Sequence, residues 1–155
     1  MPEQETVRRA RRDEREGKAP STQAGEFVRE EIEHVREGKH GARSSKQAIA
    51  IGLSKARRAG VDLPPPKKGK VSKAAERKIR ADLKAGHETG KKPSPGRSRA
   101  TKAALKREGK SAASKHALST HARKAAGKRS AADRSASARK AAKTRAAKKH
   151  SRATR

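Results

Sequence analysis

The chain has 155 residues, of which 44 are Lys or Arg and 16 are Asp or Glu, and its formal net charge is +28 at pH 7. Only 15 residues are Leu, Ile, Val or Phe, and most of the remaining apolar residues are Ala, which forms helix well but buries little surface. This composition predicts a mostly α-helical chain with extensive disorder and no substantial core, and it argues against an enzyme, whose pocket needs side chains to exclude water.

The first 63 residues are predicted to hold the most ordered part of the chain. Residues 1–21 form a charged segment with a frayed helix, because Val7 is its only large aliphatic residue. Residues 22–63 are predicted to form an αα-hairpin, with helices over about 24–37 and 46–59. Apolar side chains at helical spacing predict a small hairpin core made of Phe27, Val28, Ile32, Val35, Ile49 and Leu53. Because so few side chains make this hairpin marginal alone, we expect a second copy of the chain or a ligand to complete it.

The remaining residues alternate linkers with charged runs that are rich in Ala. Residues 64–72 are a Pro/Lys linker, 73–86 a short helix, and 87–97 a Pro/Gly linker. Residues 98–155 are a basic tail of Ala, Lys, Arg and Ser, in which large aliphatic residues are nearly absent. We expect the helices of this tail to fluctuate, and to become firm only when anions neutralise their charge.

Six histidines raise the question of a metal site. Glu31 and His34 are three residues apart on a predicted helix, a spacing that could place both on one ion, but no second pair has this spacing. His116 and His121 are five residues apart, which is poor for one helical face. We therefore expect solvated histidines, no metal site and no cofactor, and no arrangement of catalytic residues indicates an enzyme.

The sequence also bears on the compartment of the protein. No stretch has the roughly 18 apolar residues that a membrane span needs. The first residues contain no apolar run typical of a secretory signal. The absence of Cys excludes disulfides and Cys-based zinc sites. We expect no membrane span and a cytoplasmic location.

The positive charge increases along the chain. The net charge is −1 over residues 1–40, +11 over 41–96 and +18 over 97–155. Lys and Arg neutralise phosphates and release counterions without reading a base sequence, so this gradient favours sequence-tolerant binding of double-stranded DNA. The only aromatic residue, Phe27, is assigned to the core, which argues against stacking on single-stranded bases. The predicted contacts are Arg57, Arg58, Lys67, Lys68, Lys70, Arg97, Arg99, Lys102, Arg123, Lys124, Arg139, Lys140, Arg145, Lys148 and Lys149.

Two alternatives to DNA binding stay open. Small cationic tails also bind folded RNA through shape and phosphates, so the chain is alternatively an RNA-associated or ribosome-associated basic protein. A highly charged chain with few apolar residues is also typical of a disordered stress or scaffold protein without a nucleic-acid role.

Two segments resemble known groups of proteins. The run SKQAIAIGLSKAR at Ser45–Arg57, with the Gly60 and basic linker that follow, resembles a motif of small, basic, uncharacterised bacterial proteins over about residues 26–70. Residues 97–155 are similar to the Lys/Ala-rich tails of bacterial histone H1-like proteins. The first resemblance implies a bacterial origin, and the second implies association with the nucleoid.

Overall fold

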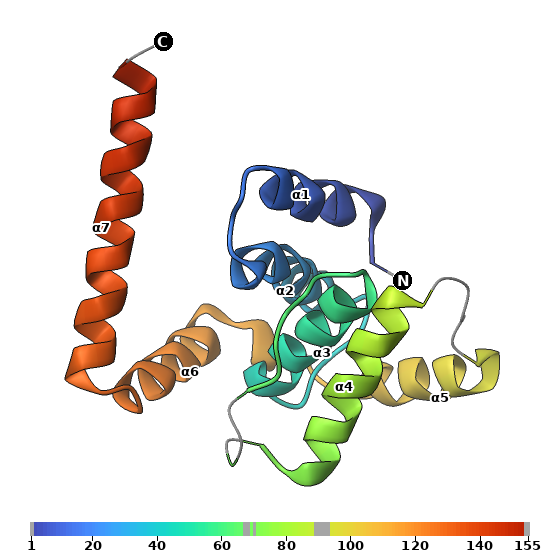
Figure 1. Ribbon diagram of the computed structural model, residues 1–155. Helices are drawn as coiled ribbons and strands as arrows, with labels where there is room; N and C mark the ends of the chain where they lie inside the picture. The colour runs from blue at the N-terminus through green and yellow to red at the C-terminus, as the bar shows by residue number, and fades with distance from the viewer. Residues whose placement is uncertain (1, 67–68, 70, 89–93, 154–155) are drawn as a thin grey trace. The chain divides into compact units, whose positions relative to one another are not determined.

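The computed structural model describes residues 2–66, 69, 71–88 and 94–153, with side chains described as far as residue 146. Within these ranges the chain forms seven α-helices, one short 3-10 helix and no strand (Figure 1). In chain order the helices are α1 (Gln4–Arg15), α2 (Pro20–Glu37), α3 (Ser45–Arg58), α4 (Lys73–His87), α5 (Pro95–Lys106), η1 (Ser111–Ala113), α6 (Lys115–Gly127) and α7 (Ala131–Ala153). The chain divides into two compact units, unit 1 (Met1–Leu118) and unit 2 (Ser119–Arg155).

Local capping chemistry accounts for several helix ends. The Ser44 hydroxyl accepts a hydrogen bond from Gln47 N–H at 3.2 Å before α3, and Ser72 caps α4 in the same way. α2 begins at Pro20, earlier than the expected residue 24, because proline is tolerated in the first turn of a helix. It ends at Glu37 and is capped by Gly38, whose φ of 79° lies in the left-handed region that favours glycine.

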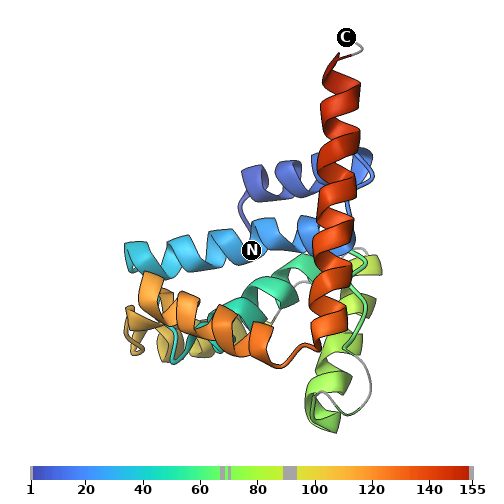
Figure 2. The ribbon, with the colours of Figure 1, turned by 90° about the vertical axis from the view of Figure 1, so that its left-hand side faces the viewer.

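The helices of unit 1 pack in succession. α1 packs on α2, α2 on α3 and α3 on α4, as Figures 1 and 2 show. The short helix η1 packs against both α2 and α3. Backbone hydrogen bonds join the α2–α3 connection to the end of α5 and the residues after it, from Gly41 N–H to Leu105 O at 2.9 Å and from Ala42 N–H to Gly109 O at 3.1 Å. The first part of the expected tail therefore belongs to the folded unit.

The N-terminal helix α1 is packed and not frayed. Thr6, Ala10 and Asp13 are buried along one side of it, at the i, i+4, i+7 spacing of a helical stripe. Lys18 Nζ lies 2.5 Å from Asp13 Oδ1 and neutralises that carboxylate. Fraying was expected because α1 has few large apolar residues, but small and ion-paired polar residues provide its buried face.

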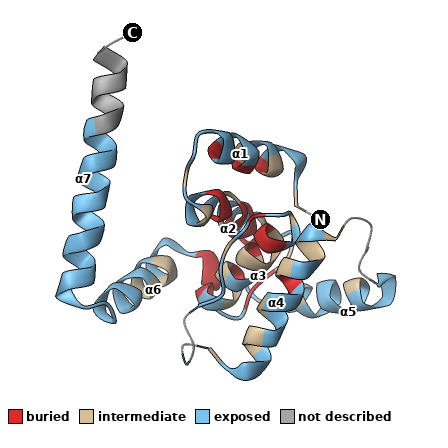
Figure 3. Ribbon diagram, viewed as in Figure 1, coloured by how far each residue is buried: buried red, intermediate tan, exposed pale blue. Residues whose placement is uncertain are grey.

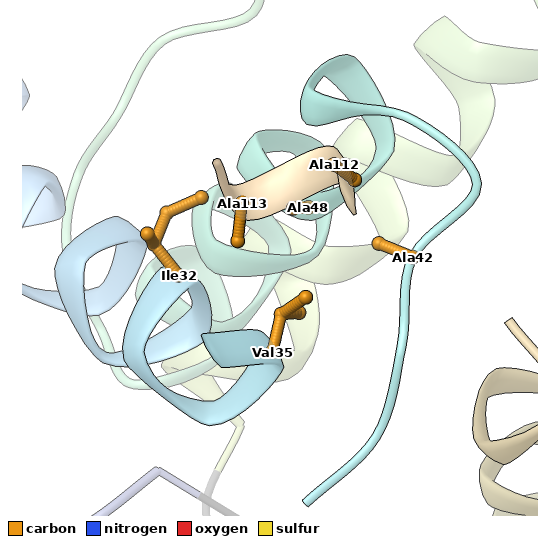
Figure 4. Packing of buried hydrophobic residues seen from close by; sticks show 6 residues of the cluster. All are labelled: Ile32, Val35, Ala42, Ala48, Ala112 and Ala113. Carbon is orange, nitrogen blue, oxygen red and sulfur yellow. The ribbon is translucent and has the colours of Figure 1, made fainter. Parts of the chain in front are cut away.

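Two apolar clusters form the core of unit 1. The first cluster joins α2, the α2–α3 connection, α3 and η1, and its buried members are Ile32, Val35, Ala42, Ala48, Ala112 and Ala113 (Figure 4). The second cluster draws mainly on α1, α2 and α3, and its buried members are Ala10, Ala24, Phe27, Ala56 and Val61. Figure 3 shows buried residues concentrated in α1, α2, α3 and η1.

The expectation of extensive disorder and no substantial core is therefore wrong. Ala and Gly let helix backbones approach closely, so many short contacts between backbones and small side chains form the core. The number of large apolar residues in the composition does not show these contacts. Ala112 and Ala113, from the part of the chain expected to be a loose tail, complete the first cluster. Of the six residues expected in the hairpin core, three are buried and three are half-buried: Phe27, Ile32 and Val35 in the first group, and Val28, Ile49 and Leu53 in the second.

The contact between α2 and α3 depends on a row of small residues. Ala48, Gly52 and Ala56 recur every four residues on α3, and all three are buried. A Cβ atom built on Gly52 would lie 2.7 Å from the Cα of Val28, closer than carbon atoms approach without displacement. The backbones of α2 and α3 thus meet at Gly52, and only a residue without a side chain fits there.

Buried charges join the same helices. Glu30 and Glu31 are 2% and 0% exposed, and Lys55 Nζ lies 3.1 Å from Glu30 Oε1 and 2.7 Å from Glu31 Oε2. Glu3 N–H donates to Glu30 Oε2 at 3.0 Å. Burial raises the pKa of Glu30, but hydrogen bonds from Glu3 N–H and Lys55 outweigh burial and hold the pKa below its ordinary value. Burial lowers the pKa of Lys55, but Glu31 and Glu30 more than reverse this and raise the pKa above its ordinary value.

Replacing Gly52 with Ala should destabilise the protein. The added methyl group costs about 1–3 kcal/mol of overpacking against the α2 backbone, and the better helix propensity of Ala returns at most about 1 kcal/mol. Urea unfolding followed by circular dichroism measures the difference. Gly25→Ala is the matched control, because a Cβ there meets nothing within 4 Å and the change should be neutral or stabilising. Equal stability of the two variants would contradict the close α2–α3 contact.

Replacing Lys55 with Met should cost about 3–5 kcal/mol of stability at neutral pH, because two buried carboxylates lose their shared counter-charge. Thermal unfolding of the Lys55→Met chain measures the loss. Lys46→Met, at an exposed position on the same helix, should change the melting temperature little. A Lys55→Met chain as stable as the control would show that the buried pair contributes nothing.

Candidate nucleic-acid interface

Ion pairs neutralise part of the positive charge of unit 1. In the described part of this unit, Lys18 pairs with Asp13 at 2.5 Å, and Arg9 Nε lies 2.9 Å from Glu26 Oε2. Further pairs of this kind occur on each helix from α1 to α4. Residues 1–118 contain 31 Lys and Arg and 15 Asp and Glu, so the carboxylates of this unit can compensate about half of its own cations.

Unit 2 has almost no internal counter-charge. Residues 119–155 contain 13 Lys and Arg and a single acidic residue, Asp133. Asp133 lies in the first turn of α7, where its N–H donates to Ser130 Oγ at 3.0 Å and its Oδ2 accepts from the same hydroxyl at 2.8 Å. One carboxylate cannot neutralise thirteen cations, so this unit carries a net charge of +12 that only external anions can balance.

Most of the side chains that the structure describes in unit 2 are exposed to solvent. Every side chain from residue 122 to 146 is exposed, and Figure 3 shows this as continuous pale blue along the described part of α7. The helical period places Arg139, Lys140 and Lys143 on one side of α7 and Arg134 and Arg145 on the opposite side. At 1.5 Å per residue the 23 residues of α7 span about 34 Å, close to one helical turn of duplex DNA.

Thirteen of the fifteen predicted contact residues fall into three groups. Those described as exposed lie on α5, α6 and α7, and they are Arg97, Arg99, Lys102, Arg123, Lys124, Arg139, Lys140 and Arg145. Lys148 and Lys149 are in α7, beyond the last described side chain. Lys67, Lys68 and Lys70 lie outside the described residues.

Two predicted contacts on α3 are used inside unit 1. Arg57 is buried, and its Nε donates to Leu63 O at 3.3 Å. Desolvation lowers the pKa of Arg57, and the nearby Asp82 carboxylate opposes that shift. Arg58 is exposed, and its Nε lies 3.2 Å from Asp82 Oδ1 on α4. Arg57 therefore ties α3 to the segment that follows it and presents no guanidinium to a nucleic acid.

Other exposed cations were not singled out from the sequence. Lys128, Arg134 and Lys143 are exposed in unit 2, as are the predicted contact residues of this unit whose side chains are described. Arg129, which precedes α7, is also exposed, but its Nη2 donates a hydrogen bond to Asp133 O at 2.9 Å. The signal that could have identified them is the near-absence of acidic residues after position 108, which applies to every cation of the segment.

Similarity to a known family is found in the first part of the chain. Residues 3–68 match the model of a family of unknown function, DUF6496. The matched segment covers α1, α2 and α3 and ends before α4. Neither the comparison with curated proteins nor that with solved structures gives a match. No described helix combines the length and apolar character needed to cross a bilayer.

Backbone amides of residues 131–146 should exchange with solvent much faster than those of α2 and α3. No buried side chain anchors this part of α7, whereas α2 and α3 share two core clusters. Hydrogen–deuterium exchange followed by mass spectrometry measures the contrast. If residues 131–146 were as protected from exchange as α2, these residues would have to be packed, which would contradict the exposure of their side chains.

Proposed function

We propose that this protein binds double-stranded DNA through the phosphate backbone, with little sequence preference, and that it is associated with the bacterial nucleoid. The observation that carries the proposal is the charge of residues 119–155, where thirteen cations accompany one carboxylate and every side chain from 122 to 146 is exposed. Such a segment lowers its electrostatic free energy most by meeting a surface of closely spaced phosphates.

The mechanism is counterion release. Duplex DNA carries about one charge per 1.7 Å of its axis, and each Lys or Arg that replaces a condensed counterion gains the entropy of its release. The length of α7 is about that of one turn of the duplex along its axis. Neutralisation of the cations of α7 by phosphates removes the repulsion that opposes the helical state. Exposed Ser and Thr hydroxyls of the same segment supply hydrogen bonds to phosphate oxygens.

The side chains present favour a duplex over single strands. Phe27 is the only aromatic residue of the chain and it is 1% exposed, so it cannot stack on bases. Reading of adenine in the major groove uses Asn or Gln, and residues 119–155 contain neither. These features support contact with the phosphate backbone and little discrimination between base sequences.

The α2–α3 hairpin is covered by other helices of its own chain. The composition of the α2–α3 hairpin leads to the expectation that a second copy of the chain or a ligand completes it. α1 and η1, from the same chain, cover the two ends of that hairpin. Part of the cover expected from a second copy or a ligand therefore comes from the same chain.

A triple change on α7 tests the proposal. Arg139→Gln, Lys140→Gln and Lys143→Gln together should weaken binding to duplex DNA at low salt. If each cation neutralises one phosphate, the slope of log K against log salt should become shallower by about 2.7. Fluorescence anisotropy with a labelled duplex of arbitrary sequence, repeated over a range of salt concentrations, provides both quantities.

The matched control removes three charges from α1. Arg8→Gln, Arg12→Gln and Arg15→Gln change exposed residues in a region whose net charge is near zero, so the slope should change by less than one. Equal effects of the two triple variants would show that net charge alone matters and that unit 2 is not the interface. Preferential displacement of the duplex by ribosomal RNA would favour the RNA-binding alternative, and no binding to either would exclude both.

A further inference from the structure

Three side chains with metal-ligating atoms gather beside the buried ion pair of unit 1. Glu31 and His34 lie one turn apart on α2, and His40 lies in the α2–α3 connection. One ligand atom from each of these residues lies within 4.8 Å of the others. Glu31 is fully buried, and the side chains of His34 and His40 are 12% and 17% exposed. The sequence predicted solvated histidines, but the fold brings these two together because Gly38 reverses the chain between them.

The charges around Glu31 leave it in need of a further cation. Glu30 and Glu31 are both buried and share the single ammonium group of Lys55. Although Lys55 Nζ lies 2.7 Å from Glu31 Oε2, neither oxygen of Glu31 accepts a hydrogen bond of regular geometry. A buried carboxylate in this position is costly unless another positive charge approaches it.

The hydrogen bonds of the two histidines prepare each ring as a ligand. His34 Nε2–H donates to Glu3 Oε1 at 2.8 Å, and His40 Nδ1–H donates to Gly41 O at 3.1 Å. Both acceptors are oxygens, so in the neutral rings the other nitrogen carries a lone pair. A histidine that donates one ring N–H to a carboxylate or a carbonyl is the usual outer-shell arrangement around a protein-bound metal.

The distance between His40 and Glu31 fits a shared cation. His40 Nε2 lies 3.4 Å from Glu31 Oε1, so a lone pair faces a carboxylate oxygen. Two ligands bound at about 2.1 Å to one tetrahedral ion are separated by about 3.4 Å. Lys55 holds the other oxygen of Glu31, which leaves Oε1 for the ion.

We propose that Glu31, His34 and His40 bind one Zn²⁺ ion, which joins α2 to the α2–α3 connection. Two imidazoles and one carboxylate are a ligand set that zinc accepts, with a water molecule as the fourth ligand. A proton on His40 would balance the charge of Glu31, but it would not account for the convergence of His34 on the same point. Glu3 and Lys55 act as outer-shell residues that orient His34 and Glu31.

The experiment uses the untagged full-length chain after treatment with a chelator, near neutral pH and without DNA. Co²⁺ serves as the probe because its visible absorption reports four-coordinate binding, and Zn²⁺ should displace it at a 1:1 ratio. Zn²⁺ should also raise the melting temperature, since a ligand that binds only the folded state stabilises it. Either His34→Gln or His40→Gln should weaken binding at least 100-fold, and Glu3→Gln about 10–100-fold.

Matched variants separate this site from general metal binding. His121→Gln and Glu33→Gln alter residues outside the cluster and should leave affinity unchanged. Circular dichroism shows whether each variant keeps its helical content, and Glu3→Gln, at an exposed residue, tests the site without removing a ligand. Absence of stoichiometric binding, or binding that survives both His34→Gln and His40→Gln, would overturn the proposal. A melting temperature that responds to pH but not to Zn²⁺ would assign the missing charge to a proton and would also overturn it.

Discussion

The close approach of α2 and α3 is the constraint on which the rest of unit 1 depends. Where Gly52 meets Val28, the two backbones come near enough for Ala48 and Ala56 to take part in the two clusters. The same approach brings Lys55 to the buried Glu30 and Glu31. With α2 and α3 fixed in this way, α1 covers one region of α2, and η1 covers another. A chain with few large apolar residues thus forms a core through proximity of backbones, for which small side chains suffice.

The sequence pattern predicts the buried side of α2 better than that of α3. On α2 the large residues Ile32 and Val35 mark the buried stripe, because burial there requires volume. On α3 the centre of the contact is Gly52, and the larger Ile49 is only half-buried. A count of large apolar residues measures how much surface a helix offers, but it does not register how closely two backbones can come. That is why disorder was expected where the chain is folded.

The candidate interface shows a related limit. Exposure of the cations after residue 119 could be anticipated, because that segment has no large apolar residue to bury. The burial of Arg57 and the role of Ala112–Ala113 could not, because the same residue types recur along the whole chain. Only the fold separates an Ala in the core from an Ala in an exposed helix. The gathering of His34 and His40 likewise depends on the turn between them, which composition and helical spacing do not describe.

The division of the chain at residue 119 has a consequence for the evolution of its sequence. Stretches of α7 can be gained or lost without disturbing the clusters of unit 1, because no side chain from 122 to 146 is buried. Under the proposed binding to duplex DNA, each added Lys or Arg that contacts a phosphate steepens the dependence of affinity on salt by a fixed increment. If the proposed function holds, the length of α7 sets the affinity for DNA, and it can evolve independently of the core of unit 1.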